Sequence, residues 1–207
     1  MLLQRPFTAI TPTLDGPVLQ VLAGADSRFS VSQVTRLVGD ASAAGVRKAL
    51  NRLVGQGMVL RESDGVAYLY RLNRNHLLAG PALEIARVGE TLREWTAEHA
   101  HTWVVPPLLL ALFGSAARGQ MQPDSDLDVL AIADDPDDQW HDDLGRLCAA
   151  MTAWTGNDTR PLVLTVAELH AEHEPVVAEI GRDARVLFGD ASLLQHARHR
   201  ALRSGAA

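Results

Sequence analysis

The stretch LLLALFGSAARGQMQPDSDLDVLAIA, residues 108–133, decides the fold of the second half of the chain. Its two apolar runs, residues 108–113 and 127–133, have the length and continuous apolar character of buried strands. Gly114 and Ser115 end the first run, and the Ala-Ala-Arg that follows predicts a first helical turn. A polar loop, residues 119–125, leads to the second run. The predicted order is therefore strand, short helix, loop and strand.

Two acids, Asp126 and Asp128, stand at the front of the second run with one residue between them. Side chains two apart in a strand point to the same face, so the two carboxylates are expected to lie side by side. Carboxylates in that position repel each other unless a cation lies between them, and oxygen ligands favour a hard cation such as Mg²⁺. The pair therefore predicts a metal site.

The Gly114-Ser115 turn predicts a phosphate site next to that metal. A turn at a helix start offers free backbone N–H groups, here with a hydroxyl, at the positive end of a helix dipole. A metal site combined with a phosphate-binding turn is typical of phosphoryl or nucleotidyl transfer.

Three segments, Gly114-Ser115, Ala117-Arg118-Gly119 and Ser125-Asp126-Leu127-Asp128, follow the order found in polymerase-β-like nucleotidyltransferases, which residues 103–190 resemble. The similarity is greatest to the minimal bacterial members. It implies a mixed sheet with flanking helices, Mg²⁺ as cofactor and a nucleoside triphosphate as ligand or substrate. Asp126 and Asp128 would be the catalytic metal ligands. The implied nucleotide-binding residues are Gly114, Ser115, Arg118 and Ser125.

The same resemblance implies a third carboxylate, on the strand after the long helix predicted at residues 140–155. That strand, within TRPLVLTV at residues 159–166, contains no acid. Arg160 or a neighbour stands where the family has Asp, and Asp158 lies in the turn before the strand. A cation there would repel a second metal. We therefore expect one metal and a nucleotide to bind, while transfer is severely slowed.

Charge divides the chain into two parts. Residues 1–75 contain nine Arg and Lys against five Asp and Glu, whereas residues 76–207 contain ten against twenty. This asymmetry indicates two units with different partners, and the basic one can meet nucleic acid. The 207 residues allow one large or two small domains, and no signal peptide or membrane span is expected. The single cysteine, Cys148, is predicted in a helix core and fits a reducing cytoplasm.

The basic part has the pattern of three helices, within residues 14–23, 31–38 and 42–57, followed by a hairpin. Its two strands, residues 58–62 and 67–72, flank Ser63-Asp64-Gly65, a hairpin-turn sequence. Residues 14–74 resemble winged helix-turn-helix regulators of the MarR and ArsR type. The resemblance implies that the third helix enters the major groove of double-stranded DNA. The residues implied to contact DNA are Ser42, Arg47, Lys48, Asn51, Arg52 and, from the wing, Arg61. The alternative is a solvated helix face on a protein-binding winged helix.

The whole chain is thus predicted to be an α/β (α+β) protein with three parts: a winged helix-turn-helix domain (1–74), a connecting helix (75–102) and a nucleotidyltransferase-like domain (103–207). Further helices are expected at 167–173, 175–181 and 191–202, and a strand at 184–188. The histidine pairs 170/173 and 196/199 are expected to be surface residues rather than zinc ligands.

Two functions remain open from the sequence. The first is a cytoplasmic, homodimeric DNA-binding transcription regulator whose nucleotidyltransferase-like domain binds a metal-nucleotide without turnover. The alternative is an active Mg²⁺-dependent nucleotidyltransferase that modifies a protein or small molecule, as antitoxins of the minimal family do, with a toxin as its partner and the winged helix as an autoregulatory part.

Overall fold

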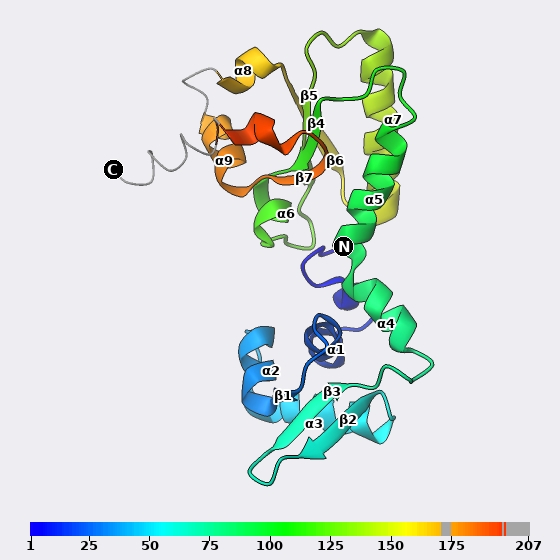
Figure 1. The fold of residues 1–207 in the computed structure, drawn as a ribbon, viewed down its shortest axis with the longest axis vertical. Helices are drawn as coiled ribbons and strands as arrows, with labels where there is room; N and C mark the ends of the chain where they lie inside the picture. Colours follow the sequence, from blue (N-terminus) through cyan, green and yellow to red (C-terminus); the bar gives the residue numbers. More distant parts are fainter. Residues whose placement is uncertain (171–174, 196, 198–207) are drawn as a thin grey trace, which may run out of the picture. The chain divides into compact units, whose positions relative to one another are not determined.

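The protein contains two compact units, each with its own sheet (Figure 1). The computed structural model describes residues 1–170, 175–195 and 197. One unit consists of Leu2 and Gln4–Val88, and the other of Met1, Leu3 and Gly89–Ala207. Helices and two sheets make up the mixed α+β fold that the sequence predicts. None of the helices in these described residues has the length and apolar character needed to cross a bilayer.

The N-terminal unit has the predicted order of three helices followed by a hairpin. Its elements are η1 (Pro6–Ala9), α1 (Asp15–Ala23), β1 (Phe29–Ser30), α2 (Val31–Val38), α3 (Ala43–Gly55), β2 (Val59–Ser63), β3 (Tyr68–Leu72) and α4 (Ala79–Ala86). The short strand β1 adds to the hairpin and gives an antiparallel sheet in the order β1-β3-β2. The sequence did not predict β1, because two residues are too few to show a strand pattern.

Local capping explains where α2, α3 and the hairpin turn lie. Ser30 accepts a hydrogen bond from the N–H of Gln33, and the Gln33 side chain accepts one from the N–H of Ser30, which fixes the start of α2. Ser42 caps α3 by accepting from the N–H of Gly45. Asp64 accepts from two backbone N–H groups of the hairpin turn. The apolar sides of the three helices then bury a core around Val18, Val34, Val46 and Leu50.

The C-terminal unit is built on a four-stranded sheet with the order β6-β5-β4-β7. β5 and β6 are parallel, and the other neighbours are antiparallel. In chain order its elements are α5 (Val88–Ala100), β4 (Leu109–Leu112), α6 (Gly114–Arg118), β5 (Leu127–Ile132), α7 (Asp138–Thr155), β6 (Thr159–Leu164), α8 (Val166–His170), α9 (Pro175–Asp183), β7 (Arg185–Gly189) and η2 (Ala191–Leu194).

Helices cover both faces of this sheet, with α7 on one side and α8 and α9 on the other (Figure 1). Leu130 and Ile132 of β5 pack with Val177 and Ile180 of α9 in a fully buried cluster. Because side chains alternate along a strand, Asp128 belongs to this same face, at its open end. The acid pair therefore lies where the α9-covered core meets solvent.

Two predicted helices differ from the structure. Residues 75–102 contain two helices, α4 and α5, because the backbone of Arg87 leaves the helical region between them. The predicted helix at 191–202 begins as the 3₁₀ helix η2, and most of its remainder lies outside the described residues. His173, His196 and His199 also lie outside them.

Candidate nucleotide site and basic surface

Strand pairing brings the Gly-Ser turn and the acid pair together. Leu112 pairs with Val129, and the N–H of Phe113 donates to the carbonyl of Asp128 at 3.1 Å, so the turn that follows β4 lies beside Asp128. A β-carbon at Gly114 would lie 2.5 Å from Oδ2 of Asp128, and Gly114 has a φ of +65°. Both facts require glycine here. The structure thus places the predicted phosphate turn directly against the predicted metal ligand.

Asp128 carries its charge in an unfavourable environment. Burial raises the pKa of its carboxyl group most, and the negative charges of Asp126 and Glu179 raise it further. Arg160 and Arg118 act in the opposite direction. A carboxylate that is both desolvated and near other carboxylates gains from a cation. The charge distribution therefore fits metal binding at this point.

Arg160 takes the position that the sequence indicated for it. In the parallel pairing of β5 and β6 it stands opposite Asp128. Its Nη1 lies 2.6 Å from Oδ2 of Asp126, and its Nε lies 3.2 Å from Oδ2 of Asp158. The next residues of β6 on this face, by alternation, are Leu162 and Leu164. This strand consequently supplies no third carboxylate.

The available ligands fit one divalent cation better than two. Among the described residues, no group of three or more His, Cys, Asp or Glu side chains could hold a metal ion. Asp126 and Asp128 remain as a pair. Mg²⁺ is commonly bound by one or two carboxylates, with water and substrate phosphates completing its coordination. The residues present therefore fit a single Mg²⁺ bound together with a nucleotide.

Arg118, predicted to bind phosphate, is held by two acids of α9. Its Nη1 forms ion pairs with Glu179 and, at 3.3 Å, with Asp183. The hydrogen bond to Glu179 is the main reason that the pKa of Arg118 is raised. The sequence alone did not predict these two ion pairs, because the two acids follow Arg118 by 61 and 65 residues.

The two predicted serines have different surroundings. Ser125 shapes the loop before Asp126: its Oγ accepts from the N–H of Gln122 at 2.8 Å, and its carbonyl accepts from the buried side chain of Asn157 at 2.9 Å. The hydroxyl of Ser115 has no hydrogen bond within the described part of the chain. Ser115 thus keeps its hydroxyl for a ligand, whereas Ser125 supports the loop.

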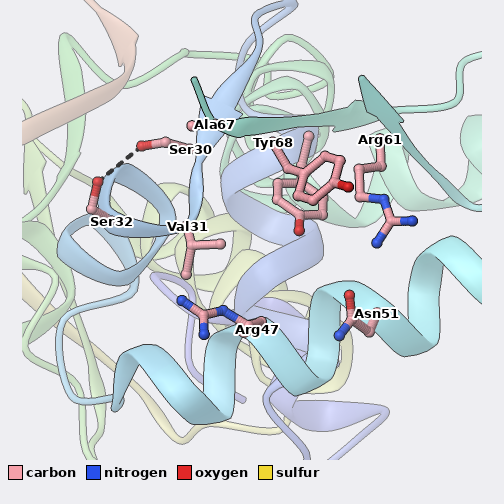
Figure 2. Close-up of a pocket in the computed structure, with 9 residues that line it drawn as sticks. Ser30, Val31, Ser32, Arg47, Asn51, Arg61, Ala67 and Tyr68 are labelled. Carbon is pink, nitrogen blue, oxygen red and sulfur yellow. Dashed lines mark hydrogen bonds between the residues drawn. The ribbon is translucent and has the colours of Figure 1, made fainter. Parts of the chain in front are cut away.

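A groove in the N-terminal unit is lined by three of the six residues predicted to contact DNA: Arg47, Asn51 and Arg61. It has a volume of about 540 Å³ and lies between α3 and the hairpin (Figure 2). Arg47 and Asn51 line it from α3, while Arg61 and Tyr68 line it from β2 and β3. A second hollow, of about 490 Å³, continues along α3 past Lys48.

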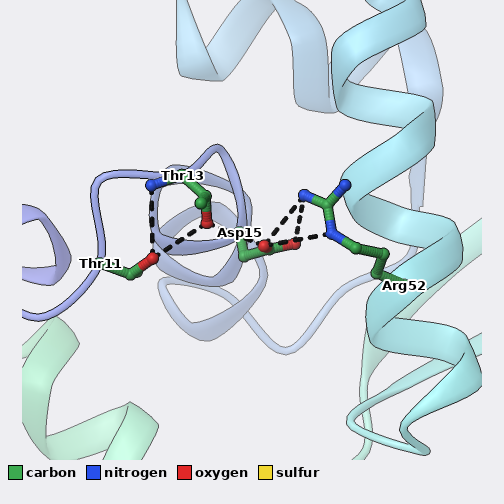
Figure 3. Close-up of polar contacts among 4 residues, drawn as sticks. All are labelled: Thr11, Thr13, Asp15 and Arg52. Atoms are coloured by element: carbon green, nitrogen blue, oxygen red, sulfur yellow. Dashed lines mark hydrogen bonds and ion pairs between the residues drawn. The ribbon is translucent and has the colours of Figure 1, made fainter.

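The predicted DNA-contacting residues differ in whether their side chains already have partners within the unit. Ser42 is used as the cap of α3, and Arg52 binds Asp15 with two nitrogens, the shortest contact being 2.9 Å (Figure 3). Arg61 stacks on the ring of Tyr68, with 4.6 Å from its guanidinium carbon to the ring centroid. Arg47 and Lys48 form no ion pair among the residues described, so their charges are available to a ligand.

One protein-family model matches part of the C-terminal unit. Residues 102–186 match the family model for the nucleotidyltransferase domain. The matched segment contains Gly114, Asp128, Arg118 and Arg160, so it includes the residues of the candidate nucleotide site. No curated protein matches the chain.

Three solved structures resemble part of the chain. One is a toxin–antitoxin with AMP-PNP, with 16% identity and a TM-score of 0.38, covering 53% of this chain and 82% of the other. Another is the tri-AMPylated HEPN toxin of Shewanella oneidensis in complex with MNT antitoxin. It has 13% sequence identity and a TM-score of 0.38, and the similarity covers 56% of this chain and 89% of the other. A third is the toxin–antitoxin MntA–HepT, with 13% sequence identity and a TM-score of 0.37. The similarity covers 56% of this chain and 90% of the other. Similarity this low does not establish a shared activity.

Proposed function

We propose that this protein is a Mg²⁺-dependent nucleotidyltransferase of the antitoxin-like kind, which transfers a nucleotidyl group to a protein partner or small molecule. The observation that carries the proposal is the packing of Gly114 against Asp128 inside the segment that matches the nucleotidyltransferase family. It brings the phosphate-binding turn and the metal ligand of the proposed reaction into contact.

Each residue of the site has a role in this proposal. Backbone N–H groups at Gly114 and the free hydroxyl of Ser115 bind phosphate oxygens. Asp126 and Asp128 hold the Mg²⁺, which supplies charge neutralisation and orientation of the triphosphate. Arg118, fixed by Glu179 and Asp183, contributes positive charge beside the turn. Burial around Asp128 strengthens these electrostatic interactions.

Incubation with labelled ATP, GTP, CTP or UTP and Mg²⁺ tests the activity. We expect label on the protein, on a co-expressed partner or on a small acceptor with at least one nucleotide. The double substitution Asp126→Asn/Asp128→Asn should abolish it. Asp134→Asn/Asp142→Asn removes the same charge from exposed positions and should leave labelling unchanged. Full labelling by the Asp126/Asp128 variant would reject the proposed site.

A second candidate function is DNA binding by the N-terminal unit as a winged helix, with the nucleotidyltransferase domain as a sensor. The observation that favours it is the groove that brings Arg47, Asn51 and Arg61 together next to Lys48. Arg and Asn can read base edges, and all the cations can bind phosphate. A homodimer would present this surface to two half-sites. A mobility-shift assay on the DNA upstream of its own gene, with sedimentation to measure the dimer, tests this candidate.

A further inference from the structure

The site contains a cation of its own, the guanidinium of Arg160. It contacts Asp126 through Nη1 and Asp158 through Nε. The sheet fixes the backbones of these residues, because β5 and β6 pair in parallel and the N–H of Leu127 donates to the carbonyl of Asp158 at 2.7 Å. Residues 126, 158 and 160 are therefore held close to one another by backbone hydrogen bonds as well as by their charges.

Negative charge exceeds positive charge around this ion pair. Asp126 lies just before β5, Asp128 lies in β5, Asp158 precedes β6, and Glu179 is close enough to raise the pKa of Asp128. Arg118 is the other nearby cation, and it is bound by the acids of α9. Among the described residues, Arg160 is therefore the cation in direct contact with Asp126, while Arg118 acts on Asp128 through its charge from a position held by α9.

Arg160 contacts one of the two carboxylate oxygens through which Asp126 could bind a metal. A divalent cation held by the acid pair needs an oxygen of Asp126, while Oδ2 of Asp126 lies 2.6 Å from the guanidinium. Two cations in direct contact with one carboxylate oxygen repel each other. We propose that Arg160 is an internal competitor for the metal, which must leave Asp126 before a divalent cation binds and which thereby sets the metal concentration that the site requires. This inference rests on the proposed nucleotidyltransferase site, in which Arg160 would regulate metal binding.

The ion pair is weak enough to be broken. The side chain of Arg160 is 64% exposed, and Asp126 is 31% exposed. Ion pairs between exposed groups contribute little, because water and salt screen them. Asp158, already in contact with Nε, offers the displaced guanidinium a partner. Arg160 can therefore move off Asp126 without leaving its charge unpaired.

Binding of Mn²⁺, followed by electron paramagnetic resonance on the full chain without nucleotide, tests the competition. For Arg160→Gln we expect binding about three- to tenfold tighter than in the wild type, as expected from loss of an exposed ion pair and of a nearby positive charge. Arg160→Asp, which adds a third carboxylate, should bind more tightly still. Arg160→Lys keeps the charge and should stay near the wild type.

Arg146→Gln is the matched control, because Arg146 is similarly exposed and pairs with Asp143 on α7. It should not change Mn²⁺ affinity. Equal affinity of Arg160→Gln and the wild type would overturn the competition, as would an equal gain in Arg146→Gln. Failure of the proposed function has a different result: Asp126→Asn/Asp128→Asn would then bind Mn²⁺ as well as the wild type does, which would overturn both proposals.

Discussion

The carboxylate of Asp128 lies so close to Gly114 that a β-carbon on residue 114 would be 2.5 Å from its Oδ2. The two residues come from different elements, the start of α6 and the second position of β5, and strand pairing brings them together. This contact couples the geometry of the phosphate turn to that of the metal ligand. A side chain at residue 114 would therefore have to displace the Asp128 carboxylate.

Gly114→Ala is therefore expected to damage both stability and binding. A positive φ at a residue with a side chain costs roughly 1–2 kcal/mol, and the methyl group also displaces Asp128. We expect a lower free energy of unfolding in urea and loss of Mg²⁺-nucleotide binding by calorimetry. Gly145→Ala is the control, since its β-carbon would meet no atom within 4 Å and lies within α7. It should be neutral or slightly stabilising, and normal nucleotide binding by Gly114→Ala would contradict the coupling.

Asp128 should make the fold less stable as the pH rises. Its pKa in the folded protein is raised, chiefly by burial and then by Asp126, so the folded state binds more protons than the unfolded state as the pH passes between the two pKa values. The unfolding free energy therefore falls with increasing pH through this window, which begins at the ordinary Asp value of about 4. Below about pH 4, Asp128 is protonated in both the folded and the unfolded state, so its ionisation no longer lowers the unfolding free energy.

Asp128→Asn removes this penalty while keeping the shape of the side chain. With EDTA present, we expect the variant to be more stable than the wild type at pH 8, and the difference to shrink towards pH 4. Mg²⁺ should narrow the gap at pH 8, because it stabilises only a fold that binds it. Asp142→Asn, at an exposed position of α7, should show no such pH-dependent gain. A gain of equal size at all pH values would rule out ionisation of Asp128 as its cause.

The features that the sequence predicts best are those within one segment. Asp126, Asp128 and Gly114 lie within one strand–turn–strand unit, where spacing alone brings them close. Arg160 could be predicted from the order of the elements, but its ion pair with Asp126 depends on the register of a parallel pair. The acids that hold Arg118 come from α9, and nothing near Arg118 in the sequence indicates them.

The same limit applies to the N-terminal unit. The helical pattern correctly predicts that Arg52 lies on a polar side of α3, but not that Asp15 of α1 binds it. That contact depends on how α1 packs against α3, which amphipathic periodicity leaves undetermined. The partner of a charged side chain on a helix surface consequently depends on tertiary packing that the sequence pattern does not show.

Cys148 should be unreactive in the folded protein. Burial raises the pKa of its thiol to about 11, so very little thiolate exists at pH 8. We expect no reaction with Ellman's reagent within the time that a small free thiol needs, and one equivalent after unfolding in guanidinium chloride. Prompt reaction of the native protein would show that α7 opens around this position.

The DNA-binding candidate predicts different roles for two neighbouring cations of α3. Lys48 has no ion-pair partner among the described residues and lines the second hollow along α3, so Lys48→Ala should weaken binding to all DNA sequences alike. Loss of one phosphate contact should reduce the slope of log K against log salt by about 0.9.

Arg52→Ala instead frees Asp15 and should lower the unfolding free energy, because Arg52 is held by that carboxylate. Arg47 lines both the groove and the second hollow, so Arg47→Ala should weaken DNA binding most. Arg146→Ala removes an equal charge from the other unit, and an equal effect on the salt slope would place the DNA surface elsewhere.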